Sequence, residues 1–383
     1  MRDPPVLPSI GSFKSIPHVA ASEVGRLAIC PLRFVFDHDL ALRRVQAYAA
    51  TAMLGTAAHE AVAAMIKAQG DGRSSTNLGS TRGVARGAFD QALTLGCRRR
   101  NSVIAERGEL PGDSTEEARS LPFYGMTRAR LARFAEQRFG EFWLWTEPVF
   151  HERGHGPPSE KGGRLRHGVE AVEAELRLRS RDGLVVGVAD CVDSRDGKVV
   201  IEELKSGEVT PERLESWRHQ LLIYAQLYRE QHGHIPDLLR VHSLAGGTHE
   251  FQCVPDEAAD AVARARAALQ DLNRRIEAGA VASELARPSE AGCNNCPHRP
   301  WCEPYWQASA PGLNAGDVEG RVASVDGWEA EVTVATGRAV RVDFSGVRVA
   351  PSAGSRLRIC GSRSTEEGSL RCVSGTSVWR VNL

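Results

Sequence analysis

The chain has 383 residues, enough for one large domain with a small one beside it, or for two domains of medium size. Its 48 basic residues balance 48 acidic ones, which excludes a histone-like coat of positive charge, so a nucleic-acid partner would have to bind a local patch. No apolar run reaches the length of a membrane span and the first residues lack the apolar core of a signal peptide, so we expect a cytoplasmic protein without membrane contact.

Helical signals dominate the first 150 residues. Ser22 has an N-cap side chain and Pro31 interrupts the pattern that follows, so a short helix should carry Cys30 at its end. The following segments alternate between helix and polar loop, and the polar part, 70–121, is expected to be an excursion from the core. The expected helices lie at 22–36, 47–67, 83–97 and 127–145.

The middle of the chain alternates strands and helices after a connection at 148–168, which is rich in glycine and proline and is expected to be flexible. Thr210 is an N-cap residue and Pro211 suits the first helical position, so a helix should begin there. The expected strands are 169–179, 184–190, 199–204, 238–243 and 250–254, and the expected helices are 210–230 and 256–278. This order predicts a mixed α/β core with helices on its faces.

The pattern changes beyond residue 310. Short alternating runs predict strands at 318–325, 328–335, 339–344, 356–361, 369–373 and 377–381. Five or six strands in about 70 residues are typical of a small barrel, so we expect two domains, 1–310 and 311–383. Arginines together with Trp328 and Phe344 would suit an OB-like groove for single-stranded nucleic acid, whereas the nearly as numerous acids would suit a protein partner or simple packing.

Three charged residues end two neighbouring strands. Asp190 closes one strand, and Glu203 and Lys205 lie two residues apart on the next, so they share one face. Two carboxylates and an ammonium could hold a divalent cation and neutralise a phosphate, but an exposed ion pair at a strand end would explain the same residues. Glu202 leaves open which acid binds the metal, although the E-x-K spacing favours Glu203.

Three polar side chains elsewhere could belong to the same site. His59 lies on an apolar helix, where a core or surface histidine is commoner than a ligand. Gln220 and Tyr224 are one helical turn apart on the helix that follows Glu203. They could hold a phosphate or the attacking water, and the alternative is a polar stripe that faces solvent.

The cysteines are clustered. Cys293, Cys296 and Cys302 form a C-x2-C-x5-C pattern, and Cys30 supplies a distant fourth thiol, which is typical of a four-thiolate site for zinc or for an iron–sulfur cluster. His298 could replace Cys30 as the fourth ligand, which would give a self-contained zinc knuckle. The remaining cysteines are expected to be buried small apolar residues, namely Cys97, Cys191, Cys253, Cys360 and Cys372.

Taken in order, these motifs resemble those of the RecB-like nucleases of the PD-(D/E)XK superfamily. The resemblance covers about 22–305 and is strongest to the iron–sulfur branch, which includes the CRISPR-associated RecB-type exonucleases and the AddB nuclease domain. The polar excursion and the C-terminal barrel are not part of a minimal nuclease of this kind, so the branch stays open. By this resemblance the catalytic residues are His59, Asp190, Glu203, Lys205, Gln220 and Tyr224, and the ligands of a [4Fe-4S] cluster are Cys30, Cys293, Cys296 and Cys302.

The resemblance implies a restriction-endonuclease-like fold and hydrolysis of phosphodiester bonds in DNA, with a single-stranded DNA exonuclease favoured. His59, Asp190 and Glu203 would hold Mg²⁺ or Mn²⁺, and Lys205 would orient or deprotonate the attacking water. The cluster, or Zn²⁺ in its place, would pin the N-terminal segment to the end of the core. Two alternatives stay open: a catalytically silent nucleic-acid-binding or scaffold subunit, and a zinc-stabilised accessory protein of a recombination or defence complex.

Overall fold

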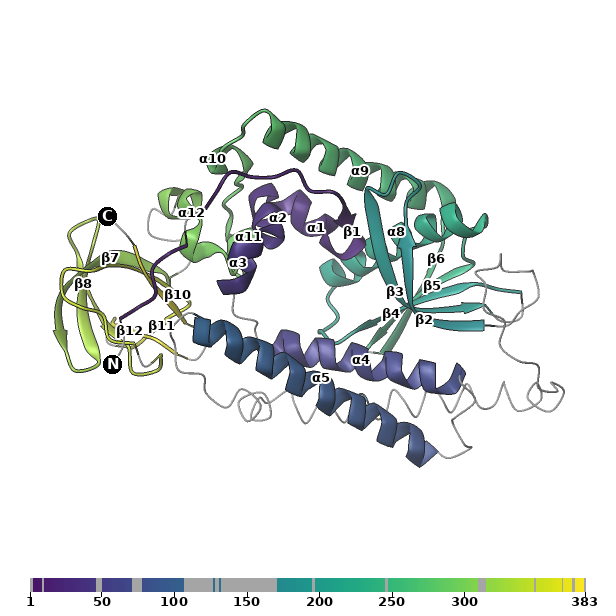
Figure 1. Ribbon diagram of the computed structural model, residues 1–383, viewed down its shortest axis with the longest axis horizontal. Coiled ribbons are helices and arrows are strands. Elements are labelled where there is room, and N and C mark those ends of the chain that lie inside the picture. The colour runs from purple at the N-terminus through teal and green to yellow at the C-terminus, as the bar shows by residue number, and fades with distance from the viewer. Residues whose placement is uncertain are drawn as a thin grey trace.

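The computed structural model describes residues 3–8, 10–45, 50–70, 78–106, 127, 131, 171–194, 197–244, 247–308, 315–347, 349–366, 368–373 and 376–381. These residues form an α/β unit around a six-stranded mixed sheet and a second, β-rich unit at the C-terminal end of the chain (Figure 1). The predicted α/β class is therefore confirmed. No helix in this described part is long and apolar enough to cross a membrane.

Strand β3 is the centre of the first sheet. Strand β2 pairs with it in antiparallel register along one side, while β1 (parallel) and β4 (antiparallel) share its other side. Strands β4 and β5 are parallel neighbours, and β6 returns antiparallel to β5. The strands are β1 Val19–Ala20, β2 Ala171–Arg179, β3 Val185–Ser194, β4 Val200–Lys205, β5 Leu238–Ser243 and β6 Gly247–Gln252. The five expected strands are present, β3 continues four residues past its predicted end, and β1 was not predicted.

Helices cover both faces of this sheet. On one face lie α8 (Pro211–His232) and α9 (Pro255–Glu277), together with α1 (Val24–Ile29) and α2 (Pro31–His38). On the other face α4 (Ala50–Gly70) packs side by side with α5 (Leu78–Glu106) (Figure 1). Two apolar clusters result, one on each face: Ile201 lies in the first and Leu204 in the second. Successive residues of β4 thus face different helices.

Two helix ends lie where the sequence predicts them, at Thr210 and at Cys30. Thr210 Oγ1 accepts a hydrogen bond of 3.3 Å from Arg213 N, and Pro211 occupies the first turn, so the predicted start of α8 is confirmed. Before α2 and α3 (Leu40–Val45), α1 ends with Cys30 as its C-cap, as expected, and this residue adopts an extended backbone. Its N–H still bonds to Arg26 O at 3.0 Å. The 3-10 turn η1 (Ala21–Glu23) precedes α1.

The segment expected to be a polar excursion is partly helical. Helix α5 begins at Leu78, inside the expected loop, and runs to Glu106, past the predicted end at residue 97. The expectation of a loop is wrong for residues 78–82 and 98–106, which extend the predicted helix at both ends, because packing of the helix against α4 stabilises it. The helix expected at 127–145 is described only at residues 127 and 131, which are helical, and the connection expected at 148–168 lies outside the described residues.

The C-terminal strands form one sheet of order β11-β12-β9-β8-β7-β10-β13. They are β7 Val318–Asp326, β8 Glu329–Val334, β9 Ala339–Asp343, β10 Arg356–Cys360, β11 Arg363–Ser364, β12 Leu370–Arg371 and β13 Ser377–Arg380. The predicted β-rich character is confirmed. The two end strands, β11 and β13, do not pair with each other within the described ranges, so the OB-like barrel stays a prediction.

The two units are joined through both ends of the first one. Leu7 N donates to Arg380 O at 3.0 Å, so the start of the chain lies along β13 of the second unit. Short elements between the units complete the contact: α10 Ala282–Leu285, α11 Glu290–Cys293, η2 Arg299–Trp301 and α12 Glu303–Ala308. The ring of Trp301 meets that of Trp379 edge-on at 5.5 Å, and Arg299 Nε donates to Asp317 at 2.6 Å. The segment around the three clustered cysteines therefore forms part of the contact between the units.

Candidate active site

Strand β4 separates two adjacent glutamates. Glu203 lies on the side of Ile201 and α8 and is 4% exposed. Glu202 points to the opposite side, where its carboxylate accepts a hydrogen bond of 2.8 Å from Arg240 Nη1. Because side chains alternate along the strand, Glu203 lies on the same side as Lys205, and Glu202 lies on the other side, where it pairs with Arg240.

Helix α8 completes a hydrogen-bonded group around Glu203. Lys205 Nζ donates to Glu203 Oε1 at 2.8 Å and to Gln220 Oε1 at 3.0 Å. Gln220 Nε2 donates to Glu203 Oε1 at 2.8 Å and to the hydroxyl of Tyr224 at 2.6 Å. A Cβ at Gly187 would lie 2.4 Å from the ring of Tyr224, so the glycine makes room for this tyrosine over β3. Gln220 and Tyr224 therefore face the site and are not a solvent-facing stripe.

Asp190 and His59 form a second pair beside this group. His59, on α4, lies 3.2 Å through Nδ1 from Asp190 Oδ1. The other carboxylate oxygen, Oδ2, accepts a hydrogen bond of 2.7 Å from Leu204 N, the residue between Glu203 and Lys205. That bond joins the middle of β3 to the C-terminal end of β4, just beyond the last pair of their ladder, which is Cys191 and Glu202. All six predicted catalytic side chains thus lie in one connected arrangement.

The charges of this arrangement are strongly coupled. Burial, together with the negative charge of Asp190, raises the pKa of Glu203 to about 7, although Lys205 opposes the shift. Burial lowers the pKa of His59, but the hydrogen bond and the charge of Asp190 outweigh burial, so the net shift is upward. Burial and the neighbouring carboxylates also raise the pKa of the Tyr224 hydroxyl, which keeps it protonated as a hydrogen-bond donor. A buried acid with a pKa near neutrality is typical of functional sites.

Comparison with known proteins identifies the family. Residues 18–303 match the sequence model of the PD-(D/E)XK nuclease superfamily. The chain belongs to this superfamily. The matched range contains all ten predicted site residues and ends before the C-terminal sheet. The PD-(D/E)XK part of the predicted resemblance is thus confirmed, while membership of the RecB-like iron–sulfur branch stays a proposal.

Other comparisons add little. Among solved structures, the crystal structure of SSO0001 is similar over 50% of this chain and 80% of that chain, with 13% identity and a TM-score of 0.25. A similarity this low carries no argument about fold or function. The search of curated proteins gave no match.

Members of the PD-(D/E)XK superfamily are typically metal-dependent nucleases, and the site has the donor atoms that a divalent cation requires. Glu203 Oε2 is buried and has no hydrogen-bond partner among the described residues, which is costly for a carboxylate oxygen unless a ligand reaches it. However, no three His, Cys, Asp or Glu side chains within the described ranges are arranged to hold an ion. The residues fit a cation by the type of their donor atoms, and in this structure the other oxygen of Glu203, Oε1, accepts from Lys205 and Gln220.

The four predicted cluster cysteines come together from distant parts of the chain. Cys30, Cys293, Cys296 and Cys302 line one small cavity, and none forms a disulfide. Burial raises the pKa of Cys296 to about 11 and that of Cys302 to about 12, which a bound metal would have to reverse. The backbone N–H groups of His298 and Tyr305 oppose these shifts and lower the pKa of Cys296 and Cys302, respectively, but burial outweighs them. The cavity is suited to a thiolate-bound group by composition, although its cysteines are not arranged around a common point in this structure.

His298, the alternative fourth ligand, lines the same cavity and is fully buried. Its Nε2 lies 2.8 Å from Asp37 Oδ1, while Nδ1 has no partner among the described residues. His298 and Cys30 thus both lie in the cavity as candidates for the fourth ligand beside the three clustered cysteines. Among the five single cysteines, the expected burial is confirmed for Cys97, Cys191, Cys360 and Cys372, whereas Cys253 is partly exposed.

The sequence pattern missed one residue beside the site. Glu175 lies across from Asp190, because its neighbours Ala174 and Leu176 pair with Cys191 and Ala189. In the sequence it belongs to the run VEAELRLR, whose charged residues alternate as on the exposed side of an ordinary strand. Its backbone φ of +56° is not visible in that pattern.

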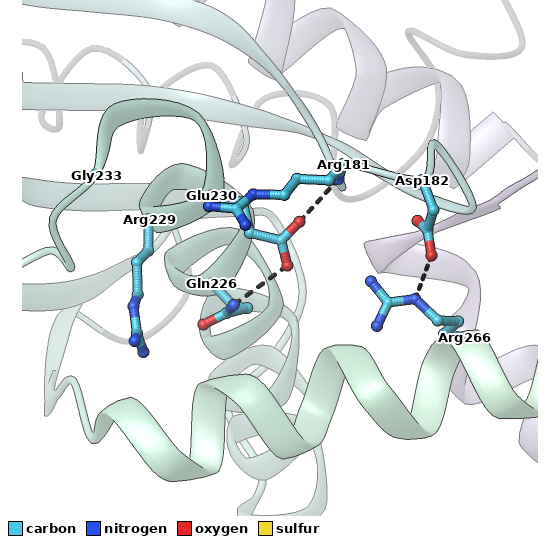
Figure 2. Close-up of a pocket in the computed structure, with 7 residues that line it drawn as sticks. All are labelled: Arg181, Asp182, Gln226, Arg229, Glu230, Gly233 and Arg266. Carbon is cyan, nitrogen blue, oxygen red and sulfur yellow. Dashed lines mark hydrogen bonds and ion pairs between the residues drawn. The ribbon is translucent and has the colours of Figure 1, made fainter.

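A polar pocket at the opposite end of α8 contains none of these residues. Figure 2 shows its charged lining, in which Arg266 Nε lies 2.5 Å from Asp182 Oδ2 and the backbone N–H of Arg181 donates to Glu230 at 2.8 Å. None of the residues predicted to be catalytic lies in its lining, where Asp182 and Arg266 form an ion pair. The hollow therefore does not compete with the Asp190–Glu203 group as the candidate active site.

Proposed function

We propose that this chain is a metal-dependent deoxyribonuclease that hydrolyses phosphodiester bonds. The observation that carries the proposal is the hydrogen-bonded group of Glu203, Lys205 and Gln220 placed next to the pair of Asp190 and His59. Together with membership of the PD-(D/E)XK superfamily, this group supports hydrolysis over a purely structural role. The alternative of an exposed ion pair at a strand end does not explain why Glu203 is buried and why its pKa is raised.

Asp190, Glu203 and His59 would hold Mg²⁺ or Mn²⁺. Such a cation, when bound, supplies a nucleophilic water and spreads the charge that develops on the phosphate. The side chain of Lys205 is fixed by Glu203 and Gln220, so its ammonium can orient the attacking water and stabilise the phosphorane-like transition state. Gln220 holds the Tyr224 hydroxyl, and the two together would position the DNA strand.

The preferred substrate in this proposal is single-stranded DNA or a DNA end, degraded as an exonuclease acts. The activity would serve DNA repair, recombination, CRISPR adaptation or phage defence. A [4Fe-4S] cluster, or Zn²⁺ as the alternative, would be held by the four cysteines and would pin α1 and α2 to the segment that ends the core. The C-terminal sheet would act as an OB-like strand-binding module or as the contact for a protein partner.

The direct test incubates single-stranded DNA, labelled at either end, with the protein and Mg²⁺ or Mn²⁺. Substrates with free and with blocked ends separate exonuclease from endonuclease action. We expect cation-dependent products from free ends and no products from Asp190→Asn. DNA that is bound but never cleaved, with either cation, would refute the proposal and favour the silent scaffold protein.

A further inference from the structure

The loop at 206–210 follows Lys205 directly and connects β4 to α8. Its path is fixed by the end of β5. Leu244 N donates to Lys205 O at 2.8 Å, and Ser243 Oγ donates to Gly207 O at 3.2 Å. A side chain that packs against this loop is therefore held at a defined place beside Lys205.

Arg213, in the first turn of α8, packs against this loop. Its Nη1 donates to Glu208 O at 3.2 Å and lies 3.2 Å from the position that a Cβ of Gly207 would take. The missing side chain at Gly207 thus lets the guanidinium approach the backbone two residues after Lys205. The bond to Glu208 O occupies one of the five N–H donors of a guanidinium.

The spacing along α8 places Arg213 on the face that borders the active site. Gln220 follows it by seven residues, and positions seven apart on a helix lie on nearly the same face. Gln220 bonds to Lys205 and Glu203, so this face is the one turned to the site. At 1.5 Å per residue the two positions are about 10 Å apart along the helix axis. Arg213 therefore lies beside the Glu203 group and not within it.

The charge of Arg213 is not balanced by a carboxylate. Arg218, on the same helix, pairs with Glu215. Arg213 forms no ion pair with any carboxylate in the part of the chain that the structure describes, and this includes its exposed neighbours Glu208 and Glu212. A positive charge and several N–H donors thus remain available at the edge of the site.

A DNA strand requires such a cation. The chain has no net charge, so its attraction for DNA has to come from local groups. Lys205 is already engaged by Glu203 and Gln220. A guanidinium can hold a phosphate through two parallel hydrogen bonds, which fixes its orientation as well as its position.

We propose that Arg213 binds a backbone phosphate of single-stranded DNA beside the scissile bond, a phosphate that stays intact in the reaction. This contact would set the position of the strand relative to Lys205. Arg213 would thereby favour substrates that extend past the scissile bond along α8. The inference rests on the proposed nuclease function, which it deepens.

The first test measures the binding of a fluorescent single-stranded oligonucleotide by anisotropy at several NaCl concentrations, without divalent cations. Each phosphate contact to single-stranded DNA contributes about 0.7 to the slope of log K against log salt. We expect Arg213→Gln to reduce the magnitude of this slope by about 0.7. Arg229→Gln, which removes an exposed arginine at the other end of the same helix, is the matched control and should keep the native slope. A native slope for Arg213→Gln would overturn the inference.

A second test separates phosphate binding from a structural role. Cleavage with Mn²⁺ is measured on oligonucleotides in which one phosphate, at successive positions from the labelled end, is replaced by a neutral methylphosphonate. We expect one position beside the scissile bond to slow the native protein about tenfold, and to cause no further loss in Arg213→Gln, which is already about tenfold slower. A lower Tm of Arg213→Gln with the native profile of positions would show that the side chain only holds the loop.

The two proposals fail in different ways. If the native protein leaves DNA intact while Arg213→Gln still shows the smaller salt slope, the nuclease function alone is refuted. If both proteins cleave DNA with the same salt slope and the same profile of positions, the inference about Arg213 alone is refuted.

Discussion

The burial of Glu203 predicts that removing its charge stabilises the cation-free protein at high pH. The pKa of this carboxyl rises from 4.5 to about 7 on folding. Folding therefore favours its protonated form, and the stability that it contributes below pH 4.5 is lost as the pH rises through 7. At about 1.4 kcal/mol for each pKa unit, the ionised carboxylate lowers the free energy of unfolding by about 3 kcal/mol at pH 8.

Glu203→Gln keeps an oxygen that can accept from Lys205 and Gln220 and replaces the unpartnered oxygen by an amide. We expect its stability, relative to the native protein, to increase by about 2 kcal/mol between pH 5 and pH 8. Urea denaturation without divalent cations measures the difference at both values. Glu208→Gln, at an exposed position, is the control and should show no such increase. Equal differences for Glu203→Gln at pH 5 and pH 8 would refute the reasoning.

Further outcomes follow from the same contacts. Mn²⁺ must displace the proton of Glu203 and that of His59, whose pKa is also raised, so calorimetry should show an affinity that falls by at least about tenfold per pH unit below pH 7 and levels off at higher pH. Tyr224→Phe removes the hydroxyl that Gln220 holds, and we expect about tenfold slower cleavage in gel assays with Tm changed by less than about 2 °C. Gly187→Ala places a Cβ against Tyr224, and denaturation should show a loss of about 1–3 kcal/mol. Anaerobically purified protein should be brown with about four iron atoms, and Cys302→Ser should lose the colour; a colourless protein with one zinc would contradict the cluster.

The sequence predicted the parts of the site that local rules determine. Strand alternation separated Glu203 from Glu202, and helical spacing placed Gln220 and Tyr224 on one face. The cap at Thr210 fixed the start of α8. These predictions depend only on residues that are neighbours in the sequence, so they can be made without the tertiary structure.

The remaining features depend on contacts between distant segments. The extent of α5 was misjudged because its composition is polar, while its stability comes from Phe89 and Leu93 packed on α4. The pairing of the N-terminal residues with β13 has no sequence pattern of its own. Glu175 resembles an exposed strand residue, and only the pairing of β2 with β3 reveals its position across from Asp190.

The central claim is that Lys205 and its carboxylate neighbours cleave phosphodiester bonds. Its most direct test is the rate at which the native protein and Lys205→Ala degrade end-labelled single-stranded DNA with saturating Mn²⁺, after circular dichroism has shown equal folding. Lys198→Ala, which removes a lysine outside the site, is the matched control. We expect native rates for the control and a loss of at least about a hundredfold for Lys205→Ala, because this removes the ammonium that Glu203 and Gln220 hold in the site and that would stabilise the transition state. Equal rates for Lys205→Ala and the native protein would place the chemistry elsewhere.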